Sequence, residues 1–317
     1  MDASLNIAIA AEFELCEKIA ETLEKSELAI EKLLIVEIYP FEEEQGIRFK
    51  NKAVAQCSPT EMDWREVDYL FFAGTVEQVA HIADAAEQGC IVIDMKGVCS
   101  TLSDIPVVVP SINETDLVEL RQRNIVSLPD PQVSQLALAA YPLLKTAHLK
   151  QIFTTSLLPA SYHQAETVTK LAGQTARLLN GIPLEDKETR LAFDVYPHNS
   201  SSLSQQFQKI FPQIDSVVFH AVQVPVFYGM AQKVSLLSDY ALDFQAQESE
   251  LVEYHDNLIT PVMSGEIESE ISQVKLHISQ VNGVENGIEF WTVGDDQRFH
   301  LACLSVKLLE AIYHQGY

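Results

Sequence analysis

The chain has 317 residues, of which 47% are hydrophobic and 21% charged, a composition typical of folded globular proteins and not of disordered or fibrous ones. A chain of this length predicts two domains that bury roughly three quarters of their unfolded surface, so that a hydrophobic core suffices without disulfides or metal. The formal net charge of −24 repels phosphate backbones and anionic lipids, so we expect neither nucleic acid nor a membrane as a partner.

Cysteine and histidine spacing gives further exclusions. The five cysteines are widely separated without a C-x-x-C pair, which predicts reduced thiols. The nine histidines show neither H-E-x-x-H nor H-x-H spacing, so we expect no metal. Residues 1–5 carry no basic segment, and no apolar run reaches the roughly 18 residues of a bilayer span. We therefore expect a cytoplasmic protein.

Short apolar runs alternate with helical patterns over residues 1–128. The helical patterns cover residues 12–25 and 76–88, where apolar residues recur at three- and four-residue spacing. The predicted strands are residues 5–11, 33–39, 69–72, 90–94, 107–109 and 124–127. Because parallel neighbours need crossover connections, this alternation predicts an α/β fold with a doubly wound, Rossmann-like parallel sheet.

A different pattern follows Pro129. A helix over 133–141 is expected to end or kink at Pro142, and the segment 165–179 reads as a second helix. Longer strands are predicted at residues 151–158, 190–196, 217–224, 273–281 and 288–293. The acidic segment 243–270 reads as an exposed connection, and residues 301–313 as an amphipathic helix that returns to the first domain. We therefore predict a dinucleotide-binding-type domain at 1–128, completed by 299–317, and an α+β dimerisation domain at 129–298.

The turn after the first predicted strand is unsuited to a dinucleotide. Such a turn needs glycines where the backbone approaches the pyrophosphate, yet the first of the 12 glycines is Gly46. Glu12 and Glu14 stand in this turn and would repel a phosphate, although acidic residues there also simply stabilise a helix dipole. Residues 41–44, Phe-Glu-Glu-Glu, would likewise repel a 2′-phosphate, or form only a solvated loop. NADP binding of the usual kind is therefore disfavoured, and we expect no cofactor.

Several motifs together resemble one enzyme family. The runs are C-I-V-I-D (90–94), D-I-P-V-V-V-P-S-I-N (104–113), L-A-F-D-V-Y-P (191–197), V-P-V-F-Y-G (224–229), and Trp291 with D-D-Q-R (295–298). In this order they resemble bacterial aspartate-β-semialdehyde dehydrogenases, and most closely the divergent Usg-like paralogues. The resemblance implies an NADP-binding-type domain, a catalytic and dimerisation domain, and a homodimer or a pairing with an active paralogue.

The chemistry of that family implies a cysteine thiolate that attacks the aldehyde, hydride transfer to NADP, and a histidine acid/base. Aligned with the family motifs, the nucleophile position is Pro131, which has no nucleophilic side chain and no backbone N–H. The acid/base histidine falls on Met230 and the arginine that holds the substrate carboxylate on Gln223. The positions of a glutamine and of a phosphate-binding arginine fall near Leu157 and Ser100. The three glycines of the cofactor turn fall on Ala10, Phe13 and Cys16.

Three other residues are candidates to replace the missing nucleophile, but each has a simpler explanation. Ser134 is expected to be a helix cap or surface hydroxyl, Cys99 a buried or incidental thiol, and His198 a solvated loop residue. Asp94 and Arg298 match the family motifs, but folding alone explains both.

The sequence therefore predicts no catalytic residues and a non-catalytic homologue that acts as a dimeric binding or regulatory protein. The alternative is an NAD(P)-dependent oxidoreductase acting on an aldehyde in amino-acid biosynthesis. A sensor of a neutral or cationic small molecule is a third possibility.

Overall fold

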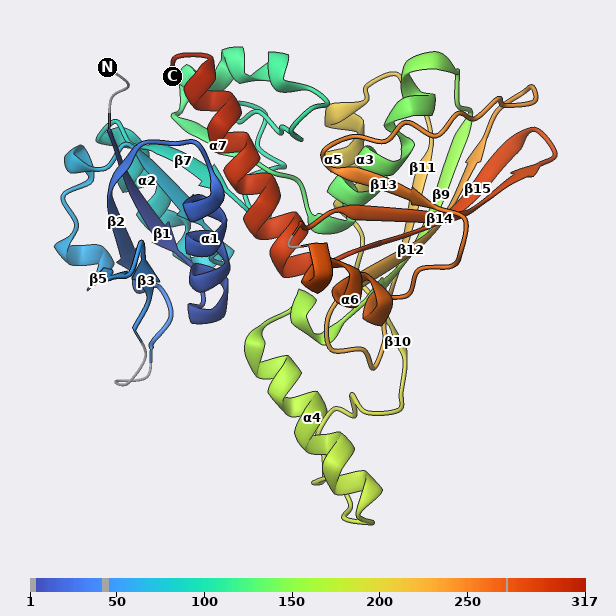
Figure 1. Cartoon of the computed structure of the whole chain (residues 1–317), viewed down its shortest axis with the longest axis horizontal. Coiled ribbons are helices and arrows are strands. Elements are labelled where there is room, and N and C mark those ends of the chain that lie inside the picture. Colours follow the sequence, from blue (N-terminus) through green and yellow to red (C-terminus); the bar gives the residue numbers. More distant parts are fainter. Residues whose placement is uncertain (1–3, 42–45, 272) are drawn as a thin grey trace. The chain divides into compact units, whose positions relative to one another are not determined.

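The computed structural model describes residues 4–41, 46–271 and 273–317. Two compact units make up the chain (Figure 1). The first unit consists of the residues up to Ser134 together with His300–Tyr317, and the second unit is Gln135–Phe299. The sequence predicts these two domain boundaries after residues 128 and 298. None of the helices in the described residues combines the length and apolar character needed to cross a bilayer.

A six-stranded sheet forms the centre of the first unit. All its neighbours are parallel, in the order β5-β2-β1-β6-β7-β8. The strands are β1 (Leu5–Ala10), β2 (Ile30–Val36), β5 (Ala55–Cys57), β6 (Tyr69–Phe72), β7 (Ile91–Asp94) and β8 (Ile125–Ser127). From β1 the chain builds outward to β2 and β5, and then to β6, β7 and β8 on the other side. This order confirms the doubly wound, Rossmann-like fold and places its switch point between β1 and β6.

Helices of the first unit bury one apolar face each. Helix α1 (Phe13–Lys25) buries Leu15, Cys16, Ile19, Ala20 and Leu23, which recur at helical spacing. Helix α2 (Val79–Glu87) follows a short 3-10 turn at Val76–Gln78. Helix α7 (Leu304–His314) continues a π-helical segment, Asp296–Cys303, and contacts α1. The hydroxyl of Tyr69 donates to the carbonyl of Tyr317 at 2.7 Å, which fixes the carboxyl terminus to β6.

Two strand predictions in the first unit need correction. Residues 107–109 form only a single bridge, from Val107 to Ser127, because prolines at 106 and 110 supply no N–H for a longer ladder. Strand β2 begins at Ile30, three residues before the predicted start, because its exposed Glu31 and Lys32 hid the strand pattern. The unit also contains the short hairpin β3 (Arg48–Phe49) and β4 (Lys52–Ala53) and a long 3-10 helix, Glu114–Gln122.

A seven-stranded mixed sheet organises the second unit, in the order β10-β11-β9-β12-β15-β14-β13. Its strands are β9 (Gln151–Leu158), β10 (Tyr196–His198), β11 (Val217–Gln223), β12 (Met230–Leu237), β13 (Val252–His255), β14 (Leu276–Val284) and β15 (Gly287–Gly294). Its helices are α3 (Pro131–Thr146), which starts in the first unit, α4 (Ala165–Leu179), α5 (Leu203–Ile210) and α6 (Pro261–Ile271). Burial alternates along β9, so one face of the sheet packs inward and the other is only half-buried.

Three predictions in the second unit need correction. Helix α3 does not end at Pro142 but runs to Thr146, whose Oγ1 donates to the Pro142 carbonyl at 3.0 Å. Residues 190–196 are not a strand, since Phe193 has a φ of 62° and breaks the extended backbone before β10. The segment 243–270 is not merely an exposed connection, because it contains β13 and most of α6. Strand β13 depends on pairing with β14, which follows it in sequence, and local periodicity could not show this.

Candidate functional site

The switch point of the first sheet carries the degenerate cofactor turn. Ala10 ends β1, Phe13 opens α1, and Cys16 lies fully buried in the first turns of that helix. The Cys16 thiol donates to the Ala11 carbonyl at 3.5 Å, and burial raises its pKa to about 12. The Phe13 ring packs edge-on against Phe41 at 5.3 Å between centroids. Side chains thus occupy the positions where family glycines leave backbone open to a pyrophosphate. Glu42–Glu44 lie outside the described residues.

Asp94, at the carboxyl end of β7, has a structural explanation. Its buried Oδ2 accepts from the Cys99 backbone N–H and the Ser127 hydroxyl, both at 2.7 Å. These bonds hold the loop after β7 against β8. Burial raises the pKa of Cys99 to about 12, and the neighbouring Asp94 adds to the shift, so this thiol is not activated. Ser100, near the position predicted for the family's phosphate-binding arginine, is buried and donates to the Gly97 carbonyl.

Pro131 is the first residue of α3, a position where a helix needs no backbone N–H. The preceding Asp130 acts as its cap, because Oδ1 accepts from the Gln132 N–H at 2.9 Å. Ser134 is neither a cap nor a surface hydroxyl: it is 2% exposed, and its hydroxyl points to the Pro129 carbonyl at 3.5 Å. The sequence reading of Ser134 was therefore wrong, because the helix start is buried. Helix initiation thus accounts for a proline at the position that the sequence predicts for the nucleophile.

Three other family positions converge in the second unit. Leu157 on β9 is paired with Val222 on β11 and with Ala231 on β12, so the ends of these three strands lie side by side. Gln223 ends β11 and Met230 begins β12. Met230 is fully buried and packs in a cluster with Leu158, Ala221 and Tyr162. The sheet thus assembles these positions, but with an apolar side chain at two of them and a neutral amide at the third.

Gln223 takes part in a cluster that the sequence did not indicate. Its Oε1 lies 2.6 Å from Nε2 of His163, and its Nε2 donates to the Val224 carbonyl at 3.2 Å. The His163 ring packs against that of His198, on β10, with centroids 5.0 Å apart, and against Tyr162 at 5.5 Å. His163 lies far from Gln223 in sequence and outside any family motif, so no sequence signal marked it.

His198 is not the solvated loop residue that the sequence suggested. It is half-buried on β10, where burial lowers its pKa and the neighbouring His163 lowers it further. A neutral imidazole at neutral pH follows. The cluster therefore offers hydrogen-bonding and stacking groups, and residues 135–299 contain no cysteine.

Asp296 is a buried carboxyl next to this region. Its Oδ1 accepts from the Ser161 hydroxyl at 2.8 Å and from the Gly229 N–H at 3.3 Å. Burial raises its pKa, and the carboxylate of Asp295 raises it further. The neighbouring Arg298 is exposed, and its backbone N–H donates to Asp295. Asp296 and Arg298 of the D-D-Q-R motif thus both serve the local fold.

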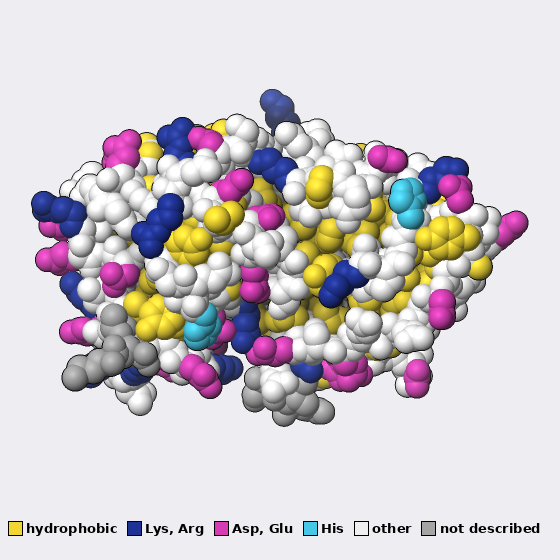
Figure 2. Space-filling model, turned by 90° about the horizontal axis from the view of Figure 1, so that it is seen from above, with side chains coloured by type: hydrophobic (Ala, Val, Ile, Leu, Met, Phe, Trp, Pro, Cys, Tyr) yellow, Lys and Arg dark blue, Asp and Glu magenta, His cyan; other side chains and the backbone are white. Residues whose placement is uncertain are grey.

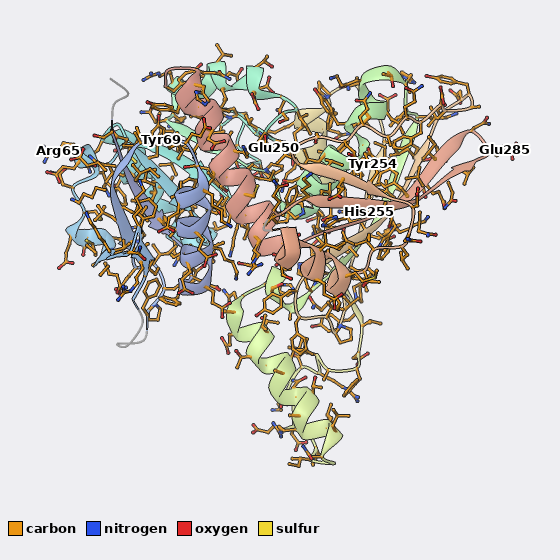
Figure 3. All side chains as sticks on the ribbon, viewed as in Figure 1. Arg65, Tyr69, Glu250, Tyr254, His255 and Glu285 are labelled. Atoms are coloured by element: carbon orange, nitrogen blue, oxygen red, sulfur yellow. The ribbon has the colours of Figure 1, made fainter. Side chains whose placement is uncertain are left out.

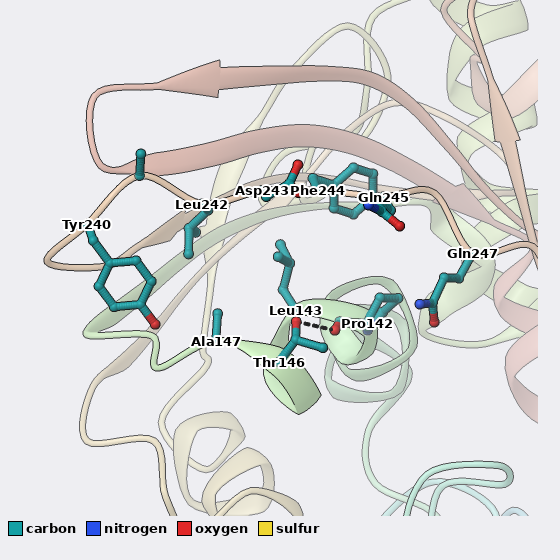
Figure 4. A pocket seen from close by; sticks show the side chains of 11 residues that line it. Pro142, Leu143, Thr146, Ala147, Tyr240, Leu242, Asp243, Phe244, Gln245 and Gln247 are labelled. Carbon is teal, nitrogen blue, oxygen red and sulfur yellow. Dashed lines mark hydrogen bonds between the residues drawn. The ribbon is translucent and has the colours of Figure 1, made fainter.

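A cavity of about 430 Å³ opens elsewhere in the second unit (Figure 4). It lies between the second half of α3 and the segment 240–247. The family positions are not among its lining residues, which include Leu143, Tyr240, Asp243 and Phe244. Asp243 is the single charged side chain of this lining, which favours a neutral or cationic occupant.

The described residues also contain one group of side chains suited to a metal ion. Glu253 and His255 on β13 and His277 on β14 place one ligand atom each within 4.8 Å of one another. None of them stands at a family catalytic position.

A doubly wound parallel domain coupled to a mixed-sheet domain, with its family positions at the strand ends, defines a two-domain dehydrogenase fold. The chain is 69% identical to the USG-1 protein homolog of Haemophilus influenzae over all of both chains. It is 30% identical to the aspartate-semialdehyde dehydrogenase of Vibrio mimicus, covering 77% of this chain and 82% of that one. No model of a protein family matches the sequence.

Among solved structures, aspartate semialdehyde dehydrogenase II of Vibrio cholerae superimposes with a TM-score of 0.89 at 26% identity, over 99% of this chain and 100% of that one. The chain belongs to the aspartate-semialdehyde dehydrogenase family, in the branch of the USG-1 protein homologs. The resemblance found in the sequence is thereby confirmed.

Proposed function

We propose that this chain does not catalyse the oxidation of aspartate semialdehyde and acts instead as a dimeric binding or regulatory protein. The observation that carries this proposal is Pro131 as the first residue of α3, at the family's nucleophile position. The proline side chain is a hydrocarbon and its nitrogen is locked in an amide, so it cannot attack a carbonyl, and the lost N–H removes a donor as well. Met230 and Gln223 support the proposal, because neither side chain can act as a proton-transferring base or pair with a carboxylate as a guanidinium does.

Relocated catalysis has little support among the thiols. Burial is the main cause that raises the pKa of Cys16, Cys90 and Cys99, which leaves the reactive thiolate scarce at neutral pH. The turn at Ala10, Phe13 and Cys16 has no glycine where the backbone would approach a pyrophosphate, and this disfavours NADP binding. An oxidoreductase activity would therefore need both a new nucleophile and a new cofactor site.

An enzyme assay tests this proposal. The full-length protein is incubated with NADP, aspartate semialdehyde and phosphate, and NADPH formation is followed by absorbance, with an active family member as the positive control. We expect no turnover above the protein-free rate. Pro131→Cys alone is expected to stay inactive, because Gln223, Met230 and the cofactor turn are unchanged. Turnover by the unmodified protein that disappears with one substitution would overturn the proposal.

The half-buried face of the second sheet supports self-association. Hydrophobic side chains form a broad surface patch on this unit (Figure 2). On the sheet itself, Phe153 of β9 pairs with Val218 of β11, and Leu157 with Val222, all of them half-buried. Lys233, on the same face, forms an ion pair with Glu289 at 3.0 Å, so its charge is balanced locally. This face mixes apolar residues with a few polar ones and has little net charge, which on a chain of net charge −24 favours a second copy of the chain as its partner.

Light scattering after size-exclusion chromatography tests the dimer. The unmodified chain should elute with the mass of two copies, and Val218→Asp should elute as a monomer because it buries a carboxylate in the paired face. Leu179→Asp, an exposed position on α4, is the control and should remain dimeric. A monomeric wild-type chain would contradict this part of the proposal, as would a dimer unaffected by Val218→Asp.

A further inference from the structure

The outer edge of the second sheet brings together two histidines and two glutamates. Glu253 and His255 are two residues apart on β13, the edge strand, so their side chains point to the same face. Glu253 is directly opposite His277 in the parallel pairing of β13 with β14. Figure 3 shows His255 and its neighbour Tyr254 on this edge strand. The alternation of the strand therefore places the histidine and glutamate together and Tyr254 apart from them.

The donor atoms of the three side chains face one another. His255 Nε2 and His277 Nδ1 lie 2.9 Å apart, and Glu253 Oε2 lies 4.0 Å from His277 Nδ1. Two nitrogens on one tetrahedral zinc ion are separated by about 3.3 Å, so a shift of a few tenths of an ångström would admit the ion. Glu253 Oε2 is buried and has no hydrogen-bond partner among the described residues. This carboxylate oxygen is therefore poised for a ligand.

A second carboxylate lies behind His277. The ring of His277 is fully buried, and its Nε2 points toward Glu268 Oε1 on α6 at 3.8 Å. Neither of these two atoms has a hydrogen-bond partner among the described residues. Histidines that bind metals through one nitrogen commonly present the other to a carboxylate, which fixes the tautomer and orients the ring. If His277 binds an ion through Nδ1, Glu268 is the carboxylate that its Nε2 faces.

We propose that Glu253, His255 and His277 bind a divalent transition-metal ion such as Zn²⁺, with Glu268 as the positioning residue for His277. Two imidazoles and one carboxylate form a donor set that zinc accepts with a fourth position left for water. Both facing nitrogens must be free of protons to bind the ion, so the proton held between them moves to the outer nitrogen of its ring and each imidazole binds in its neutral form.

The proposed ion would join the edge strand β13 to the interior strand β14. Glu253 and His255 are half-buried, so the ion could enter from solvent on their side. The site is independent of the family's catalytic positions, and it does not depend on whether the chain is an enzyme. The spacing of these residues in the sequence did not indicate a metal site, because the acidic helix α6 separates Glu253 and His255 from His277.

Equilibrium dialysis of the full-length protein against ZnCl₂, after treatment with EDTA, tests the site. We expect one Zn²⁺ per chain and a higher melting temperature with zinc. Glu268→Gln should weaken binding roughly 10-fold, as positioning partners of metal ligands do. His255→Gln and Glu253→Gln should weaken it further and abolish the zinc-dependent shift in melting temperature. His220→Gln, an exposed histidine on β11, is the matched control and should bind as the unmodified chain does.

Folding of each variant is verified by far-UV circular dichroism, which matters most for changes near the buried His277. His255 and Glu253 are partly exposed, so we expect these two variants to retain the fold. The visible absorption of bound Co²⁺ gives a second readout, which should be lost in His255→Gln but kept in His220→Gln. Less than one zinc per chain would overturn the proposal. Zinc binding that is unchanged in folded His255→Gln and Glu253→Gln would do so too.

Discussion

The side chains of His163 and Gln223 are joined at 2.6 Å, although 60 residues separate them in the sequence. Gln223 is the residue that the sequence predicts at the family's position for the arginine that binds the substrate carboxylate. Its amide is thus engaged by a residue of the same unit. The position has become part of an internal hydrogen-bond network rather than an anchor for an anion.

Replacing Gln223 by leucine tests this internal role. Gln223 is 3% exposed, so its loss leaves a ring nitrogen of His163 without its partner in a poorly solvated place. We expect Gln223→Leu to lower the free energy of unfolding by about 1–3 kcal/mol, measured by urea denaturation. Gln205→Leu, on the exposed side of α5, should change it by less than about 0.5 kcal/mol. Equal effects of the two substitutions would refute the internal role of Gln223.

Pro131 should contribute to stability through helix initiation alone. Pro131→Ala increases the freedom of the unfolded chain, and we expect a loss of about 0.4–1 kcal/mol in urea denaturation. Asp130→Ala removes the cap on the Gln132 N–H and should cost about 0.5–2 kcal/mol. A loss well above this range for Pro131→Ala would show that the ring has a packing role beyond starting α3.

Asp296 should make stability depend on pH. Its pKa is raised to about 7 in the folded chain, against roughly 3.9 in an unfolded one. Between these values the folded state holds a proton that the unfolded state has released. Stability contributed by this proton is therefore present at low pH and lost as pH rises through about 7, by up to about 1.4 kcal/mol per pH unit.

The measurement compares urea denaturation of the unmodified chain and Asp296→Asn at several values between pH 4 and 8. The asparagine variant should show a flatter profile across this range, whereas Asp243→Asn, an exposed control, should follow the unmodified chain. Parallel profiles for all three proteins would mean that Asp296 is ionised in the folded state.

The buried thiols should resist alkylation. Burial raises the pKa of Cys16 and Cys99 to about 12, so both hold their protons at pH 7 and are shielded from reagent. Half-buried Cys57 is the internal comparison. We expect iodoacetamide to modify Cys57 first and the two buried cysteines only after urea is added, as mapped by mass spectrometry. Rapid labelling of Cys99 in the folded protein would indicate an activated thiol and would favour the oxidoreductase alternative.

Much of the fold was readable from local patterns. The bounds of β6, β9 and α4 agree with the sequence prediction, because each combines a clear periodicity with definite ends. The failures have non-local or backbone causes. Strand β13 requires β14 as its partner, and Phe193 adopts a left-handed conformation that composition does not reveal. Helix α3 tolerates Pro142 because the surrounding packing outweighs the missing hydrogen bond.

The sequence by itself determined the family and predicted the residue types at its catalytic positions, because motif order and side-chain chemistry are properties of the chain alone. Tertiary structure decided what those residues do now. It alone joined Gln223 to His163, enclosed Asp296 and Ser134, and placed Glu253 and His255 against His277. These contacts depend on strand register and on burial, which a linear pattern does not encode. Residues distant along the chain become neighbours only when the sheet forms.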